Sequence, residues 1–118
     1  MKYLLMCCTE EEKLNALSKI EMDAVMDETL TYIEALRKSG HYITSERLQP
    51  VETATMVRVR DGKLSTTDGP FAETKEQFGG FWLINARDLN EAIQVASKFP
   101  SARLGGIEVR PVHELNQQ

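Results

Sequence analysis

Four charged side chains that could do acid–base chemistry lie close together in the stretch Thr67–Gly80: Asp68, Glu73, Lys75 and Glu76. The pKa of a carboxylate beside an ammonium group can be shifted widely, which is what general acid–base catalysis requires. We therefore consider Asp68 or Glu73 as the acid–base group of a small-molecule enzyme. Lys75 would hold an anionic substrate or stabilise developing negative charge, with Glu76 as a further substrate contact.

The same stretch also has an architectural interpretation, because it opens on a turn. Pro70 has no amide hydrogen to donate and Gly69 reaches backbone angles closed to other residues, so a strand cannot continue here. The Asp68 carboxylate would cap its own turn, and Glu73 with Lys75 would form an exposed ion pair that contributes at most about 1 kcal/mol. In this alternative the chain is a non-catalytic module that binds a metabolite or a protein.

Three further side chains are candidates for substrate binding. His41 directly follows an expected helix, where it is either a base at the mouth of a cleft or simply exposed. Arg58 lies on an alternating strand and would contribute charge if its face of the strand lines the cleft. Trp82 and its neighbour Phe81 must point to opposite faces of a strand, so one packs on helices and the other covers a partner surface or lines a ligand cavity.

The composition is that of a soluble globular protein, with 42% hydrophobic and 27% charged residues among 118. This length fits one domain, residues 1–118, which can bury a core without metals or disulfides. The net charge of −4 without a basic cluster argues against nucleic acid, and no apolar run is long enough to span a membrane. We expect a cytoplasmic protein with reduced thiols at Cys7 and Cys8 and with no cofactor, since no metal or phosphate-loop motif is present.

Hydrophobic periodicity predicts two helices among several strands. Ile20–Ser39 has helical spacing, with Gly40 as its cap, and we interpret its methionine-rich stripe as core packing. The second helix is expected to begin at Asp88 and to end at Pro100. Asp61-Gly62 is a strong hairpin signal. The expected strands are Lys2–Cys8, Tyr42–Gln49, Thr53–Arg60, Lys63–Thr67, Phe78–Ala86 and Ile107–Val112, with a loop at 9–19.

This order of elements predicts an α+β fold, a ferredoxin-like sandwich with an added β-hairpin. Two helices can cover only one face of its antiparallel sheet. The paired glycines Gly79 and Gly80 predict a bulge or a close approach by another backbone. If the other sheet face carries Phe81 or Trp82 with Leu4 or Leu5, it must be covered too, and we expect a homodimer joined sheet to sheet.

The central motif also carries a family likeness. Asp68-Gly69-Pro70-Phe71-Ala72-Glu73-Thr74-Lys75-Glu76, followed by Gly79-Gly80-Phe81, resembles the signature of the DGPF-domain proteins, a branch of the YCII-related family. Leu48-Gln49-Pro50 and 107–112 match as well, so the likeness covers nearly the whole chain. The resemblance implies that the subunits pair as a dimeric α/β barrel.

The resemblance further implies an active-site cleft, because relatives in that superfamily include muconolactone isomerase-like and cofactor-independent monooxygenase-like enzymes. The broader family is thought to use a His–Asp pair, but the first expected helix has no histidine, so this pair is not carried over. Members are often encoded beside extracytoplasmic-function sigma factors, which implies a sigma factor as an alternative partner. The function therefore stays open between isomerase, lyase or oxygenase chemistry and a regulatory binding module.

Overall fold

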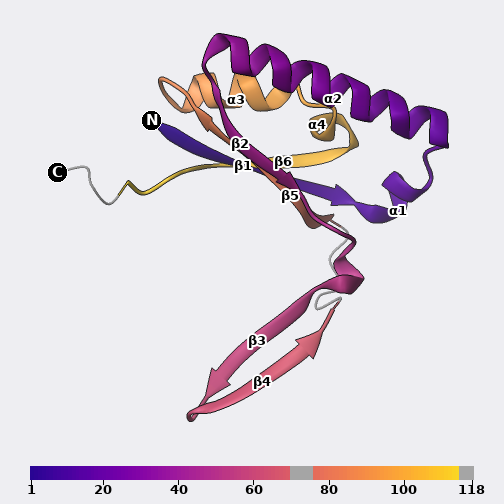
Figure 1. Cartoon of the computed structure of the whole chain (residues 1–118), viewed down its shortest axis with the longest axis vertical. Helices are drawn as coiled ribbons and strands as arrows, with labels where there is room; N and C mark the ends of the chain where they lie inside the picture. Colours follow the sequence, from indigo (N-terminus) through magenta and orange to yellow (C-terminus); the bar gives the residue numbers. More distant parts are fainter. Residues whose placement is uncertain (70–75, 115–118) are drawn as a thin grey trace.

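The structure is a computed structural model that describes residues 1–69 and 76–114, with no side-chain description for 76–77. Four strands form the main sheet and two form a separate ribbon (Figure 1). The strands are β1 (Lys2–Glu10), β2 (Tyr42–Arg47), β3 (Thr55–Arg60), β4 (Lys63–Asp68), β5 (Glu76–Asn85) and β6 (Gly105–Pro111). The helices are α1 (Glu11–Asn15), α2 (Lys19–Ser39), α3 (Leu89–Ser97), α4 (Ser101–Leu104) and the single 3₁₀ turn η1 (Val51–Thr53).

The main sheet has the ferredoxin-like strand order β2-β5-β1-β6, and its neighbouring strands are all antiparallel. The helices α2, α3 and α4 lie on one face of this sheet (Figure 1). This confirms the predicted α+β sandwich. Leu5 pairs with Trp82 on the helix side, whereas Leu4 pairs with Leu83 on the other side, so Trp82 and Phe81 face opposite ways as predicted.

The core lies between the central strands and the C-terminal half of α2 together with α3. Tyr3, Leu5 and Ile84 are almost fully buried in it. An aromatic series links the layers: the Phe99 ring stacks on Trp82 at 3.9 Å and meets Tyr32 edge-on at 4.7 Å, both measured between ring centroids. This packing fixes Trp82, which also borders the cavity described below.

The first long helix begins and ends as its sequence dictates. Ser18 and Glu21 form a reciprocal capping box at the N-terminus of α2. Gly40 ends the helix in the left-handed region at φ 83°, where glycine is favoured, so the predicted cap is confirmed. At α3, Asp88 caps as predicted by accepting from the Glu91 amide, but the Glu91 carboxylate bonds to Arg87 N instead of closing the box.

The ribbon of β3 and β4 projects away from the main sheet (Figure 1). Its turn has positive φ at both Asp61 (54°) and Gly62 (73°), which confirms the predicted two-residue hairpin. Every residue of the two strands is exposed, including Val57, Val59 and Leu64.

The structure corrects two expectations. The segment 9–19, expected to be a loop, extends β1 to Glu10 and then forms α1, and a short helix, α4, precedes β6. The stripe of α2 is only partly core: Ile33 and Leu36 are buried, whereas Met22 and Met26 border a cavity.

No helix in the described part of the chain is long and apolar enough to cross a membrane. Within residues 1–69 and 76–114, no cluster of His, Cys, Asp and Glu side chains is suited to hold a metal ion.

Candidate functional site

A cavity of about 430 Å³ lies between the N-terminal half of α2 and the sheet. Its roof is mostly apolar, because α2 turns one stripe of side chains towards the sheet. The walls are formed by three segments, namely α1, the residues that follow β2, and α4. The roof residues are Met22, Val25, Met26, Thr29, Leu30 and Ile33.

Glycines open the floor of the cavity. Along β5, Gly79 and Gly80 replace side chains that would stand between the sheet and α2, and the pairing with β1 shifts register between Cys7 and Cys8. A Cβ on Gly80 would lie 2.8 Å from the Glu46 carbonyl oxygen, so β2 also needs glycine here. The predicted bulge and close backbone approach are both confirmed.

A few polar groups border this apolar space. The Thr9 side chain stands at the end of β1, where the residue is only 7% exposed. Glu11 Oε1 accepts a hydrogen bond from Val51 N at 3.0 Å, which ties α1 to the η1 turn. Arg47 Nη1 lies 3.5 Å from the Met26 sulfur, so its guanidinium bridges β2 and α2.

An ion pair braces the wall formed by α4. Arg103 donates to both carboxylate oxygens of Glu28 on α2, at 3.0 and 2.9 Å. These hydrogen bonds hold the pKa of Glu28 below its usual value and raise that of Arg103. The pair therefore positions Ser101 and Leu104, which line the cavity.

Trp82, one of the residues predicted to bind a substrate, borders the cavity. It is 8% exposed and lies on the helix side of β5, in the floor next to the glycines. One ring face is taken by Phe99, so Trp82 joins the cavity to the core.

Among the other predicted site residues, those whose side chains the structure describes do not line the cavity. Asp68 ends β4 and Arg58 lies in β3, both exposed on the ribbon, and neither lines the cavity. Glu73 and Lys75 lie outside the described residues, and of Glu76 only the backbone, which begins β5, is described. A shared acid–base role for these residues remains a prediction.

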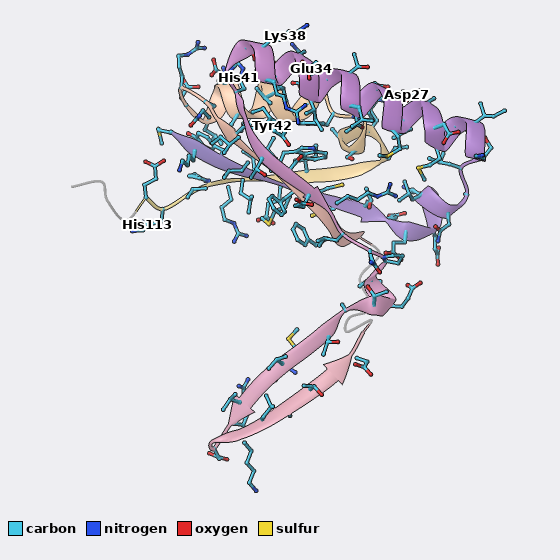
Figure 2. All side chains as sticks on the ribbon, in the orientation of Figure 1. Asp27, Glu34, Lys38, His41, Tyr42 and His113 are labelled. Atoms are coloured by element: carbon cyan, nitrogen blue, oxygen red, sulfur yellow. The ribbon has the colours of Figure 1, made fainter. Side chains whose placement is uncertain are left out.

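His41 is held in a hydrogen-bonded network at the opposite end of α2 from the cavity (Figure 2). Its Nδ1 lies 2.6 Å from Ser39 Oγ, and its Nε2 lies 3.2 Å from Glu91 Oε1. The pKa of Glu91 lies below its usual value, chiefly because its carboxylate accepts a hydrogen bond from the backbone amide of Arg87. His41 and the Arg87 guanidinium lower this pKa further. This network joins the end of α2 to the start of α3.

The sequence interpretation missed several polar residues that border the cavity, among them Thr9, Glu11, Asn15, Arg47 and Gln49. One signal was available, since Thr9 continues the alternation that Tyr3, Leu5 and Cys7 begin on β1 and so belongs to the helix face. Arg47 gave no comparable signal, because its role depends on how far α2 stands from β2.

Comparison with known proteins shows the family. The model of the YCII-related domain matches residues 1–116. An uncharacterised protein of Rhizobium meliloti (strain 1021) is 36% identical over 114 residues, which cover 95% of this chain and 92% of that protein.

Among solved structures, the chain is similar to 5-chloro-2-hydroxyhydroquinone dehydrochlorinase from Burkholderia phenoliruptrix AC1100, in complex with 2,5-dihydroxybenzoquinone. The TM-score is 0.53 at 16% identity, with 96% of this chain and 94% of that one covered. At this identity the similarity shows the fold alone. The family match and the curated relative together establish that the chain belongs to the YCII-related family.

Proposed function

We propose that this protein binds a small organic molecule in the cavity beneath α2. The observation that carries the proposal is the apolar stripe of Met22, Val25, Met26 and Leu30, which faces about 430 Å³ of space instead of the core. This volume lies in the range of small-molecule sites, which combine apolar walls with a few convergent polar groups. Methionines adapt their shape to a ligand, which suits such a roof.

We test this proposal by thermal shift and calorimetry with a panel of small carboxylates, aromatic acids and 2,5-dihydroxybenzoquinone. The quinone is included because it is the ligand in the similar fold. Ligands that bind the folded state raise the melting temperature by mass action.

Val25→Phe places extra volume inside the cavity and should weaken binding of any hit at least about tenfold, an effect of about 1.4 kcal/mol. Ile93→Phe, on the exposed surface of α3, adds similar volume elsewhere and should leave binding unchanged. A panel without hits, or hits that Val25→Phe does not weaken, would overturn the proposal.

If the protein also turns its ligand over, the reaction is acid–base chemistry in the cavity, with Glu11 as the base that takes a proton from the ligand. One Glu11 oxygen is fixed by Val51 N, which leaves the second oxygen for a substrate proton. We expect the protein to catalyse the exchange of deuterium from the solvent into the acidic C–H group of a bound enolisable ketone. Proton NMR measures the rate, because the signal of that C–H group disappears as it exchanges. Glu11→Gln should slow this exchange at least about a hundredfold while binding persists. Equal exchange rates in the variant and the wild type would exclude Glu11 as the base.

We also propose a homodimer formed through the sheet face that carries Leu4, Phe81 and Leu83. The register of β1 and β5 supports it, because these apolar side chains lie away from the helices. A sigma-factor partner, a cytoplasmic location and a single domain over residues 1–118 stay predictions.

A further inference from the structure

A buried hydroxyl in the cavity floor has no hydrogen-bond partner in the part of the chain that the structure describes. Thr9 is more than nine-tenths buried, and its hydroxyl bonds to no group of residues 1–69 and 78–114 or of the backbone of 76–77. Thr9 Oγ1 lies 3.7 Å from the position that a Cβ on Gly79 would occupy, so the glycine keeps the space beside it clear. A buried hydroxyl that is left unsatisfied is costly, and a ligand oxygen would satisfy it.

A guanidinium group, that of Arg47, stands at the rim of the same cavity. Arg47 contacts the Met26 sulfur and makes no ion pair in the described part of the chain. In the sheet, Arg47, Gly80 and Cys7 are cross-strand neighbours, and Thr9 follows two residues after Cys7 on the same face. The cation and the buried hydroxyl therefore flank the gap that Gly80 leaves.

Two carboxylates limit the charge that this cavity can accept. Glu11 and Glu52 also border it, whereas the Glu46 side chain belongs to the opposite sheet face by register. Arg47 attracts one carboxylate of a ligand, whereas Glu11 and Glu52 repel a second negative charge on the same ligand.

Resting on the proposed small-molecule function, we infer that the ligand is a small amphipathic monocarboxylic acid. Its carboxylate binds the planar fork of Arg47, for which guanidinium geometry is suited. A carboxylate oxygen or a second oxygen of the ligand accepts from Thr9, and the apolar body lies between Trp82 and the methionines of α2.

The test compares ligands of equal shape and different charge by calorimetry at constant salt: benzoate with benzamide, octanoate with octanamide, and phthalate as a dianion. The carboxylates should bind about tenfold more tightly than their amides, and phthalate more weakly than benzoate. Emission from Trp82, the sole tryptophan, reports that binding occurs in the cavity.

Two variants assign the contacts. Arg47→Gln should bring the affinity for carboxylates down about tenfold, to that of the amides, and leave the amides unchanged. Arg60→Gln removes the same charge at the tip of the exposed ribbon and should change nothing. Thr9→Val keeps the shape of the side chain, so it should raise the melting temperature of the ligand-free protein while weakening carboxylates several-fold.

The possible failures are distinct. If no probe of any charge binds, the proposed function fails, and the inference fails with it. If probes bind but carboxylates and amides bind equally, or Arg47→Gln has no effect, the cavity remains a binding site and only the assignment of a monocarboxylic acid is overturned. Circular dichroism of each variant verifies that it is folded.

Discussion

At the residue scale, the structure shows that His41 is hydrogen-bonded between two helices and does not line the cavity. His41, the most familiar catalytic side chain among the candidates, is occupied on both ring nitrogens by Ser39 and Glu91. Ser39 stands at the C-terminal end of α2, where helix carbonyls disfavour the developing negative charge of an acyl-transfer reaction. The contacts of His41 with Ser39 and Glu91 link the C-terminal end of α2 to the first turn of α3.

This link makes the stability of the protein depend on pH. The pKa of Glu91 is lower in the folded protein, first because it accepts from Arg87 N and then through His41 and the Arg87 side chain. A lowered folded-state pKa contributes stability that is present above the unfolded value of about 4.3 and is lost as pH falls through the folded value.

We therefore predict that Glu91→Gln is less stable than the wild type at neutral pH and that the difference shrinks below about pH 4.3. Urea denaturation at pH 7 and at acidic pH measures both midpoints. Glu34→Gln is the control, because Glu34 forms only an exposed pair with Arg37, and its effect should be small at every pH. A constant difference between Glu91→Gln and wild type across pH would contradict the assigned role.

At the element scale, the sequence predicted what local rules determine. Helix α2 has its cap at Gly40, the hairpin has Asp61-Gly62, and β1 contains the strand expected at Lys2–Cys8. These features depend on a few neighbouring residues, so pattern and turn chemistry were sufficient. The glycines of β5 were also interpretable, since a missing Cβ predicts close approach.

A cleft was expected, but its lining could not be predicted, because the lining depends on the distance between elements. The periodicity of α2 predicts that Met22 and Met26 face the sheet, but it does not predict whether side chains of the sheet fill the space between them and the strands. The short helices α1 and α4 that close the walls have little periodicity of their own. Asp68 and Arg58 were candidates because of their charge, but they lie on the hairpin and do not line the cavity. Arg47 lay in an unremarkable expected strand, and Thr9 in a segment expected to be a loop.

At the scale of the whole molecule, two apolar surfaces have no partner within the described chain. The first is the sheet face opposite the helices, where partly buried apolar side chains run along the two central strands: Leu4 and Met6 on β1, Phe81 and Leu83 on β5. Charged residues flank it on both edge strands, Glu46 on β2 and the Glu108–Arg110 pair on β6. An apolar centre with a charged border is typical of a protein interface.

The second surface is one side of the β3–β4 ribbon. Val57, Val59 and Leu64 share this side by register and are 58%, 59% and 70% exposed. A two-stranded hairpin alone in water is at best marginally stable, so it gains most by packing on another surface. In a two-fold dimer each copy would offer both its sheet face and its ribbon to the other, which closes the assembly.

We predict that the wild type runs as a dimer, twice the chain mass of 13.4 kDa, in size exclusion with light scattering. Leu83→Asp should convert it to a folded monomer, because the charge is solvated on the exposed sheet of a monomer but would be buried without a partner in the dimer. Ile93→Asp places the same charge on the exposed side of α3 and should leave the dimer intact. Deleting the tip of the ribbon should weaken association without abolishing it if the sheet face supplies the main contact. A wild type that is monomeric at all concentrations, or a Leu83→Asp variant that stays dimeric, would show that this face serves another purpose.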